Sequence, residues 1–234
     1  STAFVLLGLF AVRQLKLEHP VLNVRPMASI RFWPACLLVV VSMMTTFSMS
    51  VLLPLYFEGA YGMTALAAGL FILPAIAFNA VTSIAGGRVM DAHGAWPLLP
   101  IGFALIAVGQ ITISMTAANM NIGIVVALTV VVYAGVGLVL SPSQTAGLET
   151  LPVAEHPHGT ALLNTWNMIA ASFGPSLFIG LLSSSAATAG AAGAATDVAQ
   201  AIGFATAVRV AAVIAVVGFA TSLVYARRES HMSH

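Results

Sequence analysis

The stretch LPLYFEGAYGMTALAAGLFILPAIAFNAVTSIAGGRVMDAHG, residues 53–94, decides the fold of this chain. Its long middle part contains no charged residue, and about 20 apolar residues are enough to cross a hydrocarbon core of roughly 30 Å. We therefore interpret it as the end of one membrane helix, a short turn and a complete second helix. Gly86 and Gly87 are expected to turn the backbone sharply into a tight loop that holds Arg88 and Asp91.

The overall composition is that of an integral membrane protein. Of the 234 residues, 59% are hydrophobic and 6% are charged, whereas a soluble domain carries about 25% charged residues. The net charge of +1 gives no reason to expect nucleic acid as a ligand. The single cysteine, Cys36, lies in an apolar run without a disulfide partner in the chain, which favours a buried and inert thiol.

The first residues show no features of a signal peptide. Residues 3–12 form an apolar run that, at about 1.5 Å per residue, reaches only halfway across a bilayer. We expect it to be the end of a truncated helix, followed by a polar, basic linker on the cytoplasmic side. The chain then divides into this helix end and linker at 1–32, a transmembrane bundle at 33–228 and a short cytoplasmic tail at 229–234.

Hydropathy predicts six complete spans, at about 34–57, 65–86, 97–115, 122–141, 162–182 and 203–226. If the basic linker is cytoplasmic, alternation of the spans places seven of the eight Lys and Arg residues on that side. This one-sided distribution agrees with the rule that cytoplasmic loops carry the positive charge.

Two features of the last third of the chain need separate predictions. Arg209 is the exception to the one-sided charge, and we expect it to reach the outer headgroups with its long side chain; a buried, functional arginine is the alternative. Residues 183–199 are rich in Ala, Gly and Ser. They are expected to form a mobile outer loop, with a short interfacial helix as the alternative because alanine favours helix.

Several motifs resemble one known family in their order and spacing. They are PVLNVRPMASIRFW (20–33), LPLYFEGAYGMTALAAGLFILP (53–74), GGRVMDAHG (86–94), SPSQTAGLETLP (141–152) and GTALLNTWNMIAASFGPS (159–176). Together they resemble the fourteen-helix drug:proton antiporters of the major facilitator superfamily, which are multidrug efflux proteins. The motifs correspond to the linker into the ninth helix, the ninth and tenth helices with the loop after them, and the twelfth and thirteenth helices.

Two positions depart from the family pattern. The cytoplasmic loop motif of the superfamily usually has arginine directly after the aspartate, but Ala92 follows Asp91 here. The thirteenth helix often has arginine and glutamine where this chain has Asn167 and Met168. Both differences remove cation contacts on the cytoplasmic side.

The resemblance implies an all-α polytopic membrane protein. Its core would be the six-helix carboxy-terminal bundle of the major facilitator fold, a 3+3 inverted repeat preceded by a truncated helix. The implied function is half of a secondary active transporter in the plasma (inner) membrane, which exports hydrophobic or cationic small molecules in exchange for protons by alternating access. The implied partners are the small-molecule substrate, protons, the lipid bilayer and the missing amino-terminal half of the transporter.

A seven-helix receptor or photosensor is the alternative from another class of protein. It requires counting the first apolar run as a span, and the last span contains no lysine for a retinal Schiff base. An enzyme is not expected, because no cluster of ionisable residues falls at membrane depth. No cofactor is expected, and neither the His156 and His158 pair nor the terminal histidines supply a convincing set of three or four metal ligands.

The first candidate site is a gate loop formed by Gly87, Arg88, Asp91 and Gly94. Asp91 is expected at the amino end of the following helix, where its charge opposes the helix dipole for about 0.3–1 kcal/mol. A transporter alternates between two states of similar free energy, so a contact of this size is enough to shift their populations. An ordinary solvated loop with a helix cap is the alternative.

The second candidate is Asn79, in the second complete span. It recurs with Ala75 and Ser83 at four-residue spacing, which puts the three on one helix face. Small residues at this spacing favour helix packing. An amide in hydrocarbon must find hydrogen-bond partners, and a wet cavity would supply them, so Asn79 is a possible cavity-lining residue.

The remaining candidates lie in the fifth complete span. Asn164, Trp166 and Asn167 are possible cavity-lining residues near its inner end, although tryptophan there is also a common interfacial anchor. Gly174 and Pro175 form a possible hinge, because proline removes a backbone donor and bends a helix. A static packing kink is the alternative.

The carboxylate that couples transport to protons is expected on the missing half. Such an acid needs a pKa raised by desolvation, but the acidic residues of this chain fall in the connections between spans. Glu58 comes nearest to a span. It occupies a position where the family resemblance leads us to expect glutamine, so its ionisation is predicted to be dispensable.

Overall fold

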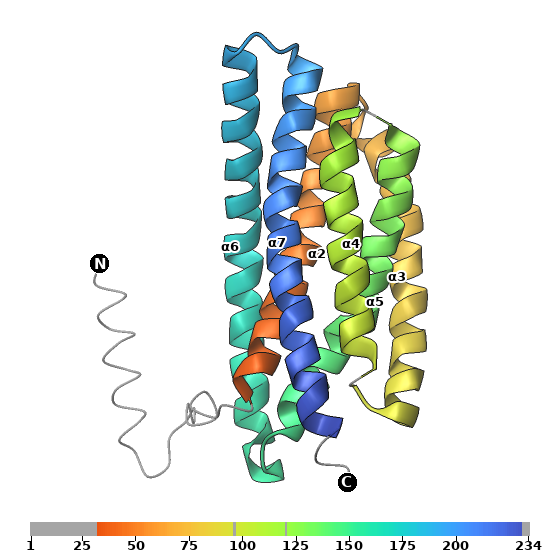
Figure 1. The fold of residues 1–234 in the computed structure, drawn as a ribbon, viewed down its shortest axis with the longest axis vertical. Coiled ribbons are helices and arrows are strands. Elements are labelled where there is room, and N and C mark those ends of the chain that lie inside the picture. The colour runs from red at the N-terminus through yellow and green to blue at the C-terminus, as the bar shows by residue number, and fades with distance from the viewer. Residues whose placement is uncertain (1–31, 96, 120, 231–234) are drawn as a thin grey trace, which may run out of the picture.

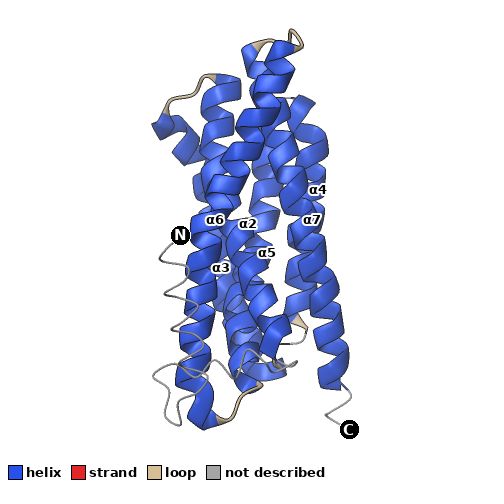
Figure 2. Cartoon of the chain, turned by 90° about the vertical axis from the view of Figure 1, so that its left-hand side faces the viewer, coloured by secondary structure: helices blue, strands red, loops and turns tan. Residues whose placement is uncertain are grey.

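The computed structural model describes residues 32–95, 97–119 and 121–230. The predicted truncated helix and most of the basic linker lie outside these residues, as do the terminal histidines. The described part is helical and contains no strand, with six long helices that run along a common axis (Figures 1 and 2). They are α2 (Phe32–Tyr61), α3 (Ala65–His93), α4 (Leu98–Thr116), α5 (Ile122–Glu149), α6 (His156–Ala191) and α7 (Thr196–Ser230).

All six helices are long and apolar enough to cross a membrane, which confirms the predicted all-α polytopic bundle. Two short 3-10 helices mark the two ends of the bundle. At the η2 end, η2 (Ala117–Asn119) lies between α4 and α5, and the α2–α3 and α6–α7 connections lie at the same end (Figure 1). At the η3 end, η3 (Val153–Glu155) lies between α5 and α6, and the α3–α4 connection is found there too.

The second predicted span continues well past its expected end, so the prediction of a sharp turn at Gly86 and Gly87 was wrong. Both glycines lie inside α3, and the chain leaves the helix at Gly94, whose φ is +78°. A positive φ favours glycine because a Cβ would clash there. Gly86 is buried against α5, where a Cβ would lie 3.5 Å from the Leu138 Cα atom, so its small size serves close packing.

Residues 183–199 were predicted to form a mobile loop, and this prediction was also wrong. α6 continues to Ala191, a turn at Gly193 with φ +91° follows, and α7 begins at Thr196. Alanine has the highest intrinsic helix propensity, and each added residue of a helix already nucleated adds another hydrogen bond. The low-complexity segment therefore lengthens two membrane helices.

The helices are arranged as two copies of the same three-helix pattern, α2–α4 and α5–α7. The corresponding contacts pair up, because α3 packs on α5 as α6 packs on α2, and α4 packs on α5 as α7 packs on α2. The equivalent helices α2 and α5 touch each other, as do α4 and α7. The repeats differ in one respect, since α6 lies along α7 whereas α3 and α4 barely touch. This pattern is that of the predicted 3+3 repeat.

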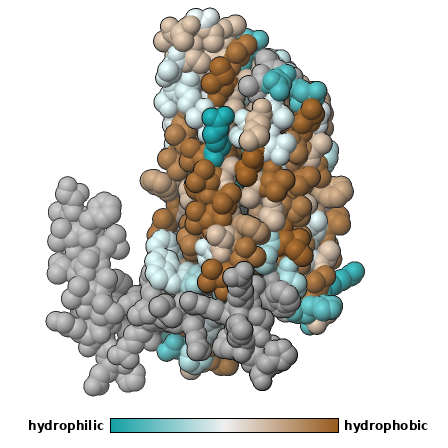
Figure 3. Space-filling model, viewed as in Figure 1, coloured by the Kyte–Doolittle hydropathy of each residue, from teal (hydrophilic) through white to brown (hydrophobic). Residues whose placement is uncertain are grey.

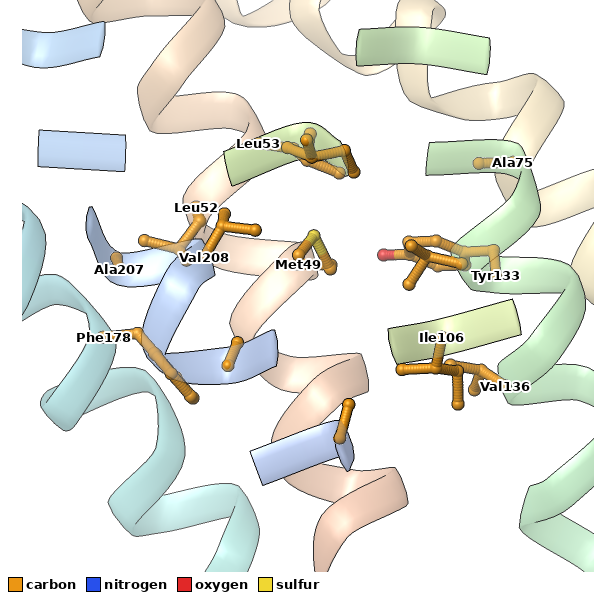
Figure 4. Packing of buried hydrophobic residues seen from close by; sticks show 14 of the residues in the cluster. Met49, Leu52, Leu53, Ala75, Ile106, Tyr133, Val136, Phe178, Ala207 and Val208 are labelled. Carbon is orange, nitrogen blue, oxygen red and sulfur yellow. The ribbon is translucent and has the colours of Figure 1, made fainter. Parts of the chain in front are cut away.

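A single large apolar cluster contains buried residues from all six long helices. Figure 4 shows Met49 and Leu52 of α2, Ile106 of α4, Tyr133 of α5 and Val208 of α7 converging at mid-bundle. Cys36 is buried in a second, smaller cluster near the start of α2. The face of the bundle seen in Figure 3 is also mostly apolar, as expected where lipid replaces water.

The six helices are buried to very different extents. More than half of the central part of α2 and of α4 is buried, against 17% for α3 and 22% for α6. These two helices are equivalents in the two repeats, and they lie on opposite flanks of the bundle in Figure 1. The flanks formed by α3 and α6 are therefore the parts of this bundle that protein covers least.

Candidate functional site

The gate-loop residues lie on the last turns of α3 and just after it, at the η3 end. Arg88 and Asp91 are exposed, and the Gly94 N–H donates to the Met90 carbonyl (2.8 Å) to cap the helix. Asp91 therefore lies at the carboxyl end of α3 and not at the amino end of the next helix, so that prediction was wrong. A negative charge in a last turn is destabilised by the helix dipole. Neither Arg88 nor Asp91 forms an ion pair with another described residue.

Asn79 joins α3 to α5 through a hydrogen bond. Its Nδ2 donates to the Tyr133 carbonyl (2.9 Å), and its side chain is half-buried. Ala75 and Gly86 on the same side of α3 are buried as well, whereas Ser83 is exposed. Two of the three residues in the four-residue pattern, Ala75 and Asn79, therefore lie on the packed side of α3. The amide finds its partner in the backbone of the neighbouring helix.

Tyr133, whose backbone carbonyl accepts the hydrogen bond from Asn79, also contacts α2 through its side chain. The Tyr133 hydroxyl lies 3.3 Å from the Ser50 hydroxyl, and the Ser50 hydroxyl itself donates to the Thr46 carbonyl (2.8 Å). Since a serine has a single hydroxyl proton, Tyr133 is the donor in this pair. Ser50 is exposed, so these contacts form a polar cluster of Ser50, Tyr133 and Asn79 that reaches the surface between three helices.

Sequence reasoning identified Asn79 in this polar cluster but missed Ser50 and Tyr133. The available signal was weak, since both occur in otherwise apolar helices and hydroxyls in membrane helices usually bond within their own helix. Most hydroxyls in the described helices behave in that way, including those of Thr46, Thr82 and Thr129. Only the tertiary structure brings Ser50 to Tyr133.

The candidates on α6 lie apart from this cluster. Asn164 is exposed, Trp166 is half-buried with its ring 5.7 Å from that of Trp33 at the start of α2, and Asn167 is half-buried. The Asn167 Oδ1 atom is buried and accepts no hydrogen bond from a described residue. α2 and α5 separate α6 from α3, so the structure does not bring the α6 candidates to Asn79.

Gly174 and Pro175 lie inside α6, which remains helical through them. Gly174 is buried against α2, and a Cβ there would lie 3.8 Å from the Met44 Cα atom, so the pair marks a contact between two helices. The opposite face of α6 carries a shallow groove of about 520 Å³. It is lined by an alternation of hydroxyl and apolar side chains at helical spacing: Thr165, Met168, Ile169, Ser172, Phe173 and Ser176.

The acidic side chains that the structure describes all lie at or near helix ends. Glu58 is exposed near the end of α2, and the others lie at the η3 end or at the start of α7: Asp91, Glu149, Glu155 and Asp197. Within the described part, no three His, Cys, Asp or Glu side chains come close enough to hold a metal ion. Arg209 differs from all of these, because it lies inside α7, far from either end of the helix.

Comparison with known proteins gives a consistent match. The model of the Major Facilitator Superfamily matches residues 4–175. The lincomycin resistance protein LmrB of Listeria monocytogenes is 32% identical over 179 residues, which are 76% of this chain and 38% of that protein. The protein of the same name in Bacillus subtilis is 31% identical over 175 residues, 74% of this chain and 36% of that protein.

A weaker relative is the riboflavin transporter RibZ of Clostridioides difficile, 21% identical over 76% of this chain and 39% of that protein. This chain thus spans less than half the length of the curated relatives it matches. The family match confirms the resemblance to multidrug transporters and the multi-pass membrane location. It favours a transporter over both an enzyme and the seven-helix receptor or photosensor. The chain belongs to the Major Facilitator Superfamily.

Proposed function

We propose that this chain is the carboxy-terminal half of a secondary active transporter that exports hydrophobic or cationic compounds in exchange for protons. The observation that carries this proposal is the sparse burial of α3 and α6, the two equivalent helices of the repeats. Two apolar flanks related by the repeat are suited to contact a second bundle of the same kind. Relatives named for lincomycin resistance support a drug as the substrate.

The substrate path is proposed to run along the surface between these flanks. The polar cluster of Ser50, Tyr133 and Asn79 offers hydroxyl groups there, and the groove on α6 adds further hydroxyls. Thr165 and Ser172 in that groove donate to carbonyls of their own helix, so their oxygens remain free to accept hydrogen bonds. Apolar side chains between the hydroxyls suit a hydrophobic compound, and exposed hydroxyl oxygens suit a cation.

The gate is proposed to involve Arg88 and Asp91, acting between the two halves. On its own helix Asp91 is in an unfavourable position, at the carboxyl end. A carboxylate in this position has no favourable helix dipole within its own bundle. A positive partner on the missing half, such as a helix amino end, therefore stabilises it more than it would stabilise a carboxylate that already caps a helix amino end. Such a contact would form in one state of the transport cycle and break in the other, which is how a weak interaction shifts a two-state equilibrium.

The proton site is proposed to lie on the missing half. The described carboxylates are at helix ends and accessible to water, where nothing desolvates them as coupling requires. Glu58, the nearest to a span, is exposed at the η2 end.

The test is reconstitution of drug efflux from two halves. The chain alone, expressed in a cell that lacks its own efflux pumps, should not lower accumulation of a fluorescent cationic dye, because a cavity between two bundles needs both. Co-expression with the amino-terminal half of a relative such as LmrB should restore efflux, and a protonophore should abolish it. Efflux by the purified chain alone in vesicles would contradict the proposal.

A matched pair of variants tests the substrate path within this assay. Tyr133→Phe removes the hydroxyl in the polar cluster and should lower the apparent affinity for the dye several-fold. Thr129→Val removes a buried hydroxyl that bonds only within α5 and should leave transport unchanged. Equal effects of the two variants would show that the cluster has a structural role only.

A further inference from the structure

Arg209 is the one charged side chain among the described residues that lies in the interior of a membrane helix. It is exposed, and it forms no hydrogen bond or ion pair with another described residue. A charge at membrane depth is costly and usually has a partner. The structure therefore leaves a cation whose partner is not on the described part of the chain.

The position of Arg209 along the bundle follows from its neighbours. The Phe204 ring stacks on Tyr56 at 4.2 Å, and the Tyr56 hydroxyl donates to the Ala117 carbonyl (2.9 Å) at the end of α4. Phe204 is therefore level with the η2 end, and Arg209 lies five residues deeper, which is about 7.5 Å at 1.5 Å per residue. Arg209 therefore lies deeper along α7 than the η2 end of the bundle.

The direction of α7 sends the side chain back toward that surface. Side chains on a helix tilt toward its amino end, and the amino end of α7 is the η2 end (Figure 1). This direction lets the aliphatic part of Arg209 lie on the bundle while the guanidinium group extends toward the η2 end. Near the carboxyl end of α7, the same tilt would direct a lysine or arginine toward the middle of the helix and not toward the nearer end.

Arg209 also lines a groove between α4 and α7. The groove has a volume of about 370 Å³, and apart from Ser114 its other lining residues are apolar: Ile111, Met115, Ala212, Val213 and Val216. Ser114 donates to the Ile111 carbonyl (2.7 Å) and so offers no free proton. Met115 and Val213 are well exposed, at 70% and 62%. The groove therefore combines one cation at its upper level with an apolar track that leads deeper into the membrane.

We propose that this groove binds a phospholipid of the leaflet at the η2 end, with its phosphate on Arg209 and an acyl chain along the Val213–Val216 track. The guanidinium group suits a phosphate because it donates two parallel hydrogen bonds. The groove lies on the α4–α7 face, which is mainly apolar with a few polar patches (Figure 3). α4 is already well buried, unlike α3 and α6, so this face does not need a second bundle to cover it.

The proposal is tested by lipid binding to the full chain purified in detergent. The probes are phosphatidylglycerol, diacylglycerol with the same acyl chains, and glycerol 3-phosphate, each followed by native mass spectrometry. Phosphatidylglycerol should bind, and both the lipid without phosphate and the phosphate without acyl chains should bind at least about tenfold more weakly. A tenfold change corresponds to about 1.4 kcal/mol.

Variants separate the two parts of the site. Arg209→Gln should weaken phosphatidylglycerol binding about tenfold, Arg209→Lys should weaken it less, and Val213→Trp should block the track while keeping the cation. Arg88→Gln, which changes an exposed arginine at a helix end outside the groove, is the matched control and should leave phosphatidylglycerol binding to the chain unchanged. Circular dichroism shows whether each variant is folded.

Three outcomes would overturn the proposal. The first is unchanged phosphatidylglycerol binding in Arg209→Gln. The second is binding of glycerol 3-phosphate as tight as that of the lipid, which would indicate a plain anion site. The third is a dimer of the chain that dissociates on Arg209→Gln or Val213→Trp, which would show that a second copy occupies the groove.

Discussion

Replacing Gly137 with alanine should separate α3 from α5 and destabilise the bundle. Gly137 of α5 faces α3, and a Cβ there would lie 2.6 Å from the Asn79 carbonyl oxygen and 3.0 Å from the Ser83 nitrogen. It would also meet the Thr82 hydroxyl. The Thr82 side chain is free to rotate away, but the two backbone atoms move only if the whole helix moves.

The size of the effect follows from three contributions. Overpacking with a backbone shift costs about 1–3 kcal/mol, and two backbone contacts place this case in the upper half of that range. Loss of the bond between Asn79 and the Tyr133 carbonyl adds about 0.6 kcal/mol, the average for a hydrogen bond between membrane helices. The better helix propensity of alanine offsets about 1 kcal/mol. The net loss of unfolding free energy is then about 2 kcal/mol.

Unfolding in detergent micelles with increasing dodecyl sulfate, followed by circular dichroism, measures this loss. Gly69→Ala in α3 is the matched control, because a Cβ there meets nothing within 4 Å. The control should be as stable as the unmodified chain or more stable by up to about 1 kcal/mol. Wild-type stability of Gly137→Ala, or an equal loss in both variants, would refute the packing argument.

Three further predictions concern topology and transport. Cysteines placed at His93 and Asn119 in a Cys36→Ala background should react with impermeant reagents from opposite sides of the membrane, Asn119 from outside; equal labelling from one side would disprove the orientation. In the reconstituted transporter, Asp91→Asn should slow efflux while leaving drug binding intact and raising bundle stability by about 0.3–1 kcal/mol, since a negative charge leaves the carboxyl end of α3. Lower drug affinity at unchanged turnover would assign Asp91 to the substrate site. Glu58→Gln should retain proton-driven exchange, and loss of coupling with intact drug binding would make Glu58 the proton site.

The number, order and membrane character of the helices were predictable from the sequence. A run of apolar residues of sufficient length is a local property, and in lipid the backbone has to satisfy its own hydrogen bonds within a helix. The same constraint explains the boundary errors. Gly86 and Gly87 weaken a helix in water, but at the end of a membrane helix packed on α5 they continued it to His93.

The candidate site was only partly predictable. The four-residue spacing of Ala75, Asn79 and Ser83 marked a packing face of α3 for the first two residues, because helical periodicity is also local, whereas Ser83 is exposed. The hydrogen-bond partner of Asn79 could not be predicted from the sequence, since the Tyr133 carbonyl lies 54 positions further along the chain. The sign of the helix dipole at Asp91 was misjudged because it depends on where one helix ends and the next begins.

The sequence by itself therefore determined that residues 33–228 form six apolar membrane helices and that the chain resembles drug transporters. These conclusions rest on composition and on motifs, which can be recognised without knowing any contact between helices. Only the tertiary structure decided that α3 and α6 remain sparsely buried, that Ser50, Tyr133 and Asn79 form one cluster, and that Arg209 lines a groove against α4. Each depends on residues from different helices, and every helix here is apolar on nearly all sides, so no sequence pattern tells which side meets which neighbour.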